Sequence, residues 1–389
     1  MTAEIIFFPV GNGDMTLIKT SSGKNILIDC NIRDPKDNPD VLKMLKDELN
    51  TDGLGRHYVD LFVWSHPDED HCRGVSSNFF LGKPDEYPQG SKKIFIKEIW
   101  SSPVVYRRAN KKEGFVFCKD AKDLKGEVKR RVIHFKENWF ASDGNRVRVL
   151  GEDENNKTDN IPQITLKLDE KTSVIGGISQ SDFTAYLYGP ASPSKISGEE
   201  EKFSKNNSSV IINYAISSGQ TTAKFLTGGD AEVACWENLH DRLSDSLSNL
   251  DYHILQTPHH CSWHSLSEES WSKIKEKKLD PGENVSQKAL ETLNNAQSEA
   301  IIVSSSNAIE DDSNDPPCYG AKDQYQNIVS EVDGKFVCVA DSLDDDGNNV
   351  PYRIEISDTG GIKTKSGSSF AGSLGGGAHV NRSGTDSYA

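Results

Sequence analysis

The stretch "WSHPDEDHCRG", residues 64–74, concentrates metal-binding side chains in one short turn. It follows the apolar run "YVDLFVW" (58–64), which is typical of a buried strand. His66, Asp68, Asp70 and His71 form the pattern H-x-D-x-D-H, and the proline at 67 stiffens the turn. Two imidazoles and two carboxylates are costly to hold this close together without a cation, and divalent metals bind these ligand types. The pattern therefore predicts a metal site directly after a strand; the alternative is a solvated acidic loop with incidental histidines.

Two later segments supply further candidate ligands at the ends of predicted strands. "LTGGD" (226–230) ends on Asp230, and "TPHHCSWHS" (257–265) carries His259 and His260. Asp230 is equally well explained as the N-cap of a helix, and the two histidines are ambiguous on their own. Together with the first motif, these residues favour a dinuclear site shared between two halves of the chain.

The composition restricts the kinds of partner. The chain has 389 residues and a formal net charge of −15. Such an acidic chain does not coat nucleic acid through bulk electrostatics, so any nucleic-acid contact must come from a local basic patch or a metal site. The 7 cysteines are odd in number and form no CxxC pair, which argues against a disulfide framework or a thiolate zinc site and indicates a reducing cytoplasm. The N-terminal "MTAEIIFFPV" does not resemble a signal peptide, and no apolar stretch approaches the roughly 20 residues of a membrane span, so we expect no membrane association.

Hydrophobic periodicity predicts a mixed α/β organisation. Strands are predicted at 4–10, 15–20, 25–30, 58–65, 208–216, 223–230, 251–258 and 299–306, and helices at 40–49 and 232–243. We expect one domain over 1–360, made of two β-rich halves with polar insertions at about 81–131 and 265–298. Residues 361–389 are Gly/Ser-rich and predict a flexible tail; a tail docked on a protein partner is the alternative.

The ordered set of motifs resembles the metallo-β-lactamase superfamily, and within it the soluble metallo-β-lactamase-like domain of the ComEC DNA-uptake protein. The resemblance covers about residues 4–330. It rests on "GNGD" (11–14), "ILID" (26–29), "SHPDEDH" (65–71), the Asn206, Ser208 and Val210 strand, "FLTGGD" (225–230) and "PHHCS" (258–262).

This resemblance implies an α/β (α+β) fold, a four-layer αββα sandwich with the site at one edge of its two sheets. Two divalent ions, Zn or Mn, would share Asp230 and a water whose pKa falls toward neutrality, giving the attacking hydroxide. His66 and Asp68 are assigned to one ion. Asp70, His71 and one of His259 or His260 are assigned to the other. Asp70 and Asp230 are the candidate catalytic residues.

The chain departs from the superfamily pattern at several positions. Asp68 stands where the commonest loop has His, and the extra oxygen ligand makes manganese an alternative to zinc. A metal-binding His is also missing between the loop and Asp230. His134 lies there, but in a segment interpreted as a basic strand, so we take it as structural and expect water or a carboxylate such as Asp153 to complete the site. The late "YGHP" of ComEC-like relatives is "YGAK" here, with Tyr319 kept and Lys322 available to contact a phosphate.

Four weaker candidates remain. Asp29 is a candidate acceptor that orients a ligand imidazole, and a plain strand-end carboxylate explains it equally well. Asn207, Ser208 and His264 are candidate substrate contacts, with strand-edge hydrogen bonding and a surface loop as their structural explanations.

Three functions fit these observations. The first is hydrolysis of phosphodiester bonds, as a nuclease or nucleotide phosphodiesterase, with nucleic acid or a small nucleotide as substrate. The second is hydrolysis of a lactone, thioester or amide, and the third is a catalytically inactive, metal-stabilised binding module. Basic residues in the first insertion could guide a phosphate chain, although a solvated face explains them as well. They are Lys92, Lys93, Arg107, Arg108, Lys111, Lys112, Arg130 and Arg131. The oligomeric state is not predicted.

Overall fold

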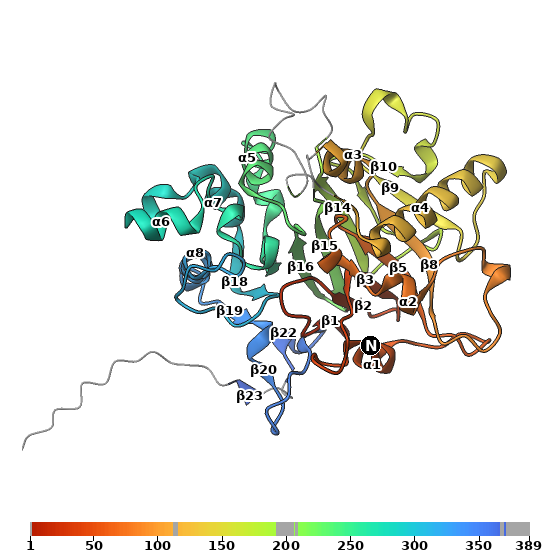
Figure 1. Ribbon diagram of the computed structural model, residues 1–389, viewed down its shortest axis with the longest axis horizontal. Coiled ribbons are helices and arrows are strands. Elements are labelled where there is room, and N and C mark those ends of the chain that lie inside the picture. The colour runs from red at the N-terminus through yellow and green to blue at the C-terminus, as the bar shows by residue number, and fades with distance from the viewer. Residues whose placement is uncertain (1, 112–115, 192–205, 207–208, 366–368, 371–389) are drawn as a thin grey trace, which may run out of the picture.

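A computed structural model describes residues 2–111, 116–191, 206, 209–365 and 369–370. Within these residues two large sheets face each other, as Figure 1 shows. The first sheet has the order β10 (Thr165–Leu166), β9 (Arg146–Leu150), β8 (Ile94–Ser101), β5 (Tyr58–Trp64), β3 (Asn25–Ile28), β2 (Thr16–Lys19), β1 (Ala3–Phe7), β21 (Tyr352–Ser357) and β22 (Gly361–Thr364), and β7 (Phe79–Phe80) pairs with β8. The second has the order β11 (Lys171–Thr172), β14 (Phe183–Gly189), β15 (Ile211–Ser218), β16 (Thr221–Thr227), β17 (Tyr252–Gln256), β18 (Ala296–Ser304) and β19 (Lys335–Cys338).

Helices cover the outer face of each sheet. Over the first sheet lie α1 (Val41–Glu48), α2 (Val75–Asn78), α3 (Pro103–Lys111) and α4 (Lys119–Asn138). Over the second lie α5 (Val233–Arg242), α6 (Trp271–Lys277), α7 (Gln287–Leu293) and α8 (Tyr319–Ser330). The smaller pairs are β4 (Cys30–Asn31) with β6 (Cys72–Arg73), β12 (Val174–Ile175) with β13 (Ile178–Ser179), and β20 (Ser342–Leu343) with β23 (Ser369–Phe370).

Strand alternation produces three hydrophobic layers between the four structural layers. Ile5 and Phe7 of β1 point to the core between the sheets, where Phe7 meets Phe225 edge to face at 5.7 Å. Ile6, between them in sequence, points to the opposite core under α1 and α4. Trp236 of α5 packs in the third core, on the outer face of the second sheet. This is the four-layer αββα arrangement that the resemblance implies.

Most predicted elements are confirmed within a few residues, but one assignment is wrong. His134 lies in α4, a helix of 20 residues, and not in a basic strand. The β-branched pair next to it suggested a strand, whereas the buried positions Ala121, Leu124 and Phe135 recur at helical spacing. The segment is a helix and not a strand because this face packs on the first sheet.

Two segments form strands of the first sheet, although the sequence placed one in an insertion and the other in the tail. Strand β8 lies inside the segment 81–131, and it pairs with both β5 and β9 near the middle of the first sheet. Residues 361–364, which the sequence places in the tail, form β22 beside β21. Residues 371–389 of the tail lie outside the described residues, and the domain boundaries stay predictions.

The described part of the chain contains no helix with the length and apolar character that crossing a membrane requires.

Candidate metal centre

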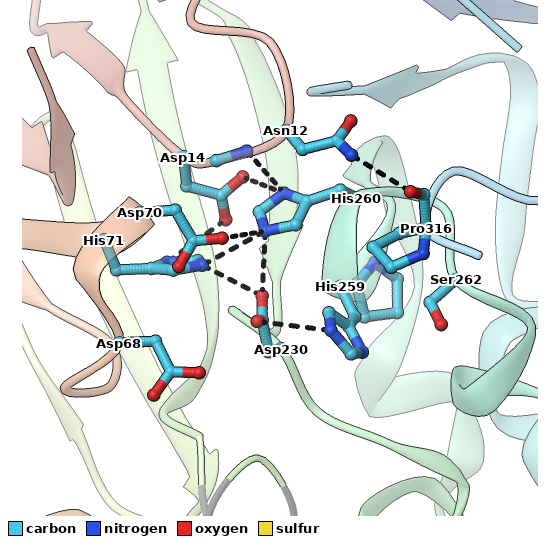
Figure 2. A network of polar contacts seen from close by, with 12 residues as sticks. Asn12, Asp14, Asp68, Asp70, His71, Asp230, His259, His260, Ser262 and Pro316 are labelled. Atoms are coloured by element: carbon cyan, nitrogen blue, oxygen red, sulfur yellow. Dashed lines mark hydrogen bonds and ion pairs between the residues drawn. The ribbon is translucent and has the colours of Figure 1, made fainter. Parts of the chain in front are cut away.

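Three loops bring the metal-binding side chains together where the two sheets meet. The first loop follows β5 and contains the short 3₁₀ turn η1 (Glu69–His71). The second follows β16 and ends at Asp230, and the third follows β17 as the turn η9 (Pro258–His260). Figure 2 shows Asp230 at the centre, with His71 and Asp70 on one side and His259 and His260 on the other. The strand ends therefore place one buried cluster between the halves of the sandwich.

Site 2 is formed by Asp70, His71, Asp230 and His260, whose ligand atoms all lie within 4.8 Å of one another. Oδ1 of Asp230 is 2.9 Å from Nε2 of His71 and 3.3 Å from Nε2 of His260. The two imidazole nitrogens are 3.3 Å apart, and Oδ2 of Asp70 is 3.4 Å from His260 Nε2. Four donor atoms from three loops thus surround one point.

Site 1 is formed by His66, Asp68 and Asp230. Nε2 of His66 lies 3.2 Å from Oδ2 of Asp230 and 3.7 Å from Oδ2 of Asp68. Nε2 of His259 approaches the same Asp230 oxygen at 3.5 Å. The two carboxylate oxygens of Asp230 therefore face two different ligand sets, as a bridging carboxylate does in dinuclear sites.

The spacing of these atoms fits ligands of a metal ion. Two ligands about 2.1 Å from one ion at tetrahedral angles lie about 3.4 Å apart, and the four contacts of site 2 span 2.9 to 3.4 Å. Nε2 of His66 and Oδ1 of Asp230 are buried, and outside the cluster of candidate ligands neither has a hydrogen-bond partner among the described residues. Buried polar atoms without partners are costly, and a shared cation satisfies both.

Two carboxylates lie next to the Nδ1 atoms of the two site 2 imidazoles. Asp29 lies 2.8 Å from Nδ1 of His71 and also accepts hydrogen bonds from the backbone N–H and the hydroxyl of Ser65. Asp14 lies 3.3 Å from Nδ1 of His260. With a proton on Nδ1, His71 presents the lone pair of its Nε2 to the site, as metal-binding imidazoles require. Nδ1 of His260 also lies 3.2 Å from the backbone N–H of Gly13 and 3.2 Å from the backbone oxygen of Ser305.

The backbone at this centre adopts an uncommon conformation. Asp29, His259, His260 and Cys261 have φ values of 55°, 49°, 52° and 65°, in the left-handed region. Non-glycine residues enter this region at an energetic cost and cluster there at functional sites. In η9 this conformation at successive residues directs His259 toward site 1 and His260 toward site 2.

The charges of the cluster depend on one another. Burial opposes ionisation of Asp230, but the surrounding imidazoles, His71 first, hold its pKa well below 3.8. Burial and His71 oppose protonation of His66, yet the Asp230 carboxylate outweighs them and raises the pKa of His66 to about 9. Burial raises the pKa of Asp29, against the effect of His71. The pKa values of His71 and His260 are likewise raised by the Asp230 carboxylate against burial, whereas burial lowers the pKa of His259. Without a metal the centre therefore favours protonated His66, His71 and His260, and a divalent ion would replace those protons.

The remaining sequence candidates lie in several places. Asn207 and Ser208 lie outside the described residues; the neighbouring Asn206 has its Nδ2 3.5 Å from Nε2 of His259. His264 is 40% exposed, and its Nε2 is 3.8 Å from Asp315. Tyr319 and Lys322 lie in the first turn of α8, with Lys322 Nζ 5.9 Å from the Tyr319 ring.

Two residues weighed as possible metal ligands lie elsewhere. Asp153 forms an ion pair with Arg107, and His134 lies on α4 close to Asn138, so neither belongs to the clusters formed by the described residues. Asp14, Ser65 and Glu232 were not predicted from the sequence as site residues. Glu232 Oε1 is 3.9 Å from Nδ1 of His259. The only signal for Asp14 was its position in "GNGD", which reads as a turn.

Comparison with known proteins gives little. No protein-family model and no curated protein matches the chain. Among solved structures, the chain is similar to the metallo-beta-lactamase GOB-18 from Elizabethkingia meningoseptica, with 12% sequence identity and a TM-score of 0.30. That similarity covers 74% of this chain and 88% of that chain.

Proposed function

We propose that the protein is a metal-dependent hydrolase of the metallo-β-lactamase type that cleaves phosphodiester bonds. One observation carries the proposal: the two oxygens of the buried Asp230 face two ligand sets, His71 and His260 on one side and His66 on the other. The order of layers and of motifs along the chain supports the superfamily, because the ligands follow β5, β16 and β17 at one edge of the αββα sandwich.

Two divalent ions bound at sites 1 and 2 would supply Lewis-acid charge that lowers the pKa of water and stabilises a developing oxyanion. Asp230 holds the two ligand sets together at the centre. Asp70 is the ligand residue that substrate can reach, because its side chain remains 31% exposed while those of His71 and His260 are buried. We assign Asp70 to orient the attacking water at the open side of the centre. Its pKa lies below 3.8, since contacts with His260 and His71 outweigh burial, so it stays an acceptor.

The donor set supports phosphorus as the reaction centre. Three carboxylates accompany the histidines at the centre: Asp68, Asp70 and Asp230. Oxygen ligands favour harder ions such as manganese beside zinc, and hard ions suit the charged oxygens of a phosphodiester. Hydrolysis at carbon would instead call for a more apolar pocket around the substrate acyl group.

The deciding experiment combines metal content with turnover. The full chain and a variant carrying Asp70→Ala and His71→Ala are purified, and bound metal is quantified. Both proteins are assayed on bis-p-nitrophenyl phosphate and on p-nitrophenyl acetate with added zinc or manganese. A matched control carries His240→Ala and Asp241→Ala, which removes the same two residue types from the outer face of α5.

The proposal expects about two metals per chain and cleavage of the phosphodiester in the wild type and the control. The variant should lose that cleavage and at least one metal. Cleavage of p-nitrophenyl acetate alone would show that the protein hydrolyses esters at carbon and not at phosphorus. Bound metal without turnover of either ester would favour a binding module, and absence of metal would overturn the proposal.

A further inference from the structure

Helix α4 carries cations on its outer face, although the chain as a whole has a net charge of −15. Lys122, Lys129 and Lys136 are exposed and follow one another at intervals of seven residues. Since seven residues make nearly two helical turns, the three side chains share one face about 10 Å apart. No carboxylate among the described residues lies within ion-pair distance of Lys122 or Lys129. Figure 1 shows α4 on the outer side of the sheet, beside β8 and β9.

A groove runs along this helix. Two hollows of about 460 and 590 Å³ lie end to end along α4, and both are lined by Gly126 and Arg130. The first also contacts Ser76 and Lys122, and the second reaches Lys129 and His134. Together they follow the helix for most of its length.

Two of the four acidic residues that line the groove are neutralised within it. Asp123 pairs with Lys119 and accepts a hydrogen bond from Ser76. Glu127 is held by Arg130 and Arg131. Asp85 and Glu137 line the hollow of about 590 Å³ together with Lys83 and Lys129. The excess of positive charge is therefore greatest in the hollow of about 460 Å³, which Lys93, Lys119 and Lys122 line.

Gly126 lines both hollows of the groove and has no side chain to fill them. It is an exposed residue within the helix, where glycine is less stable than alanine. A Cβ at this position would meet no atom within 4 Å, so packing in the protein does not require the glycine. Its place between Lys122 and Lys129 lets a ligand approach the helix backbone closely.

The groove begins beside the metal loop. Cys118, which caps α4, has its Sγ 3.7 Å from Sγ of Cys72, the residue after His71. Asp120 in the first turn accepts hydrogen bonds from the backbone N–H groups of Gly74 and Ser76. The helix is thereby fixed to the segment that carries the site 2 ligands, and its cations extend away from the centre.

Aromatic side chains are exposed at the far end of the helix. Trp139 is 62% exposed and Phe140 is 67% exposed, directly after the last residue of α4. The Trp139 ring rests edge to face on Phe135 at 5.8 Å, which leaves its outer face open. Cations along a groove followed by exposed aromatic rings are the combination that binds single-stranded nucleic acid, through phosphates and base stacking.

We propose that the α4 groove binds single-stranded nucleic acid and leads it toward the metal centre. The proposal rests on the proposed phosphodiesterase function and deepens it, because it names a polymer as the substrate. Lys122 and Lys129 contact successive phosphates across Gly126, and Trp139 stacks on a base.

Binding is measured with the full chain and a fluorescein-labelled 20-nucleotide single strand, by anisotropy in the presence of chelator so that no cleavage occurs. The test variant carries Lys122→Gln and Lys129→Gln. The matched control carries Lys273→Gln and Lys277→Gln, which removes two exposed cations four residues apart on α6. A third variant is Trp139→Ala.

We expect Kd to rise about tenfold or more in the test variant and to stay within twofold in the control. The slope of log K against log salt should fall by about 1.4, since each lost phosphate contact on a single strand contributes about 0.7. Trp139→Ala should raise Kd roughly tenfold and leave the slope unchanged. Equal Kd values for wild type and test variant would overturn the proposal, as would equally strong competition by poly-L-glutamate, which would identify an acidic protein as partner.

Cleavage of bis-p-nitrophenyl phosphate by the wild type separates the two proposals. Cleavage of this small ester with no loss of strand binding in the test variant rejects the groove and leaves the phosphodiesterase function standing. Loss of strand binding without any ester cleavage rejects the function and keeps the groove as a nucleic-acid site.

Discussion

Asp29 and His71 are joined by a hydrogen bond of 2.8 Å, and Asp29 makes it from a left-handed backbone with φ of 55°. Both side chains are completely buried. The strand β3 ends one residue earlier, so the turn at Asp29 directs the carboxylate back toward the loop that follows β5. The sheet thus fixes the orientation of the His71 imidazole, a candidate metal ligand, and places a proton on its Nδ1.

Asp29→Asn should therefore weaken metal binding by about 10- to 100-fold while leaving the fold intact. Asparagine tolerates the left-handed backbone, so the change removes the charge of Asp29 with little added strain. Metal affinity is measured by competition with a chromophoric chelator. The control is Asp60→Asn, which removes a buried carboxylate paired with Lys97 on the same sheet. Equal losses in both variants would assign the effect to general destabilisation.

Gly13 should tolerate no side chain. A Cβ there would lie 2.0 Å from Nδ2 of Asn31 and 2.9 Å from the backbone oxygen of Asp70, which itself accepts a hydrogen bond from the N–H of Asp14. Gly13→Ala must shift the loop that carries Asp70, so we expect loss of metal together with a lower free energy of unfolding. Gly23→Ala is the control, since φ there is also positive but no atom lies within 4 Å; it should cost about 1–2 kcal/mol. Urea unfolding and metal analysis of both variants give the comparison.

The sequence predicted the parts of this molecule that depend on local pattern. Buried runs such as "NILI" and "YVDLFVW" predicted β3 and β5, and the ligand types at His66 to His71 predicted the first loop. It could not divide His259 from His260 between the sites. Both residues have left-handed φ values, which direct the two side chains to different sites, and the residue type histidine does not predict this backbone conformation.

Contacts between residues far apart in the chain could not be predicted from the sequence either. Asp14 lies beside His260, which is 246 residues later in the chain, because the start of β2 meets the end of β17, where the Thr16 hydroxyl donates a hydrogen bond to Gln256. A Gly-rich turn before a strand gave no sign of that contact. The prediction for His134 was wrong because the apolar residues of its segment are few and widely spaced, and the packing of α4 on the first sheet shows which of them are buried.

Asp68→His should change the metal preference of site 1. Oδ2 of Asp68 lies 3.7 Å from Nε2 of His66, so an imidazole in its place would add a nitrogen ligand on the same side. Nitrogen ligands favour zinc over manganese, and we expect the ratio of zinc to manganese bound to rise by roughly an order of magnitude. Equilibrium dialysis against both ions, followed by elemental analysis, measures the ratio. An unchanged ratio would mean that Asp68 does not bind the ion.

Removal of metal should lower the stability of the wild type but not of Asp230→Ala. A ligand at 1,000 times its Kd stabilises the folded state by about 4 kcal/mol, which for a chain of this size is a Tm shift of about 5 °C. Asp230→Ala removes the carboxylate shared by both sites, so chelator should leave its Tm unchanged. Calorimetry with and without chelator makes the comparison. A wild-type Tm that does not change when chelator is added would contradict a metal-stabilised centre.

The two sheets are also clamped together far from the metal centre, and this clamp should respond to acid. The Asp182 carboxylate accepts hydrogen bonds from the backbone N–H of Ser22 at 2.6 Å and the hydroxyl of Ser21 at 2.8 Å, which joins the turn after β2 to the start of β14. Burial opposes ionisation, but these hydrogen bonds outweigh it and lower the pKa of Asp182 below 3.8. A carboxyl with a lowered folded pKa adds stability above its unfolded pKa and loses it as pH falls through the folded value.

Asp182→Asn should therefore cost about 1.5–3 kcal/mol at pH 7, the range for hydrogen bonds to a charged group. The difference from wild type should narrow steadily below about pH 4, because the wild-type carboxyl takes up its proton there and loses its advantage. Urea unfolding of both proteins at pH 7, 5 and 3, in chelator so that metal binding does not vary with pH, measures the difference. A gap that stayed constant across this range would show that Asp182 acts through its shape and not through its charge.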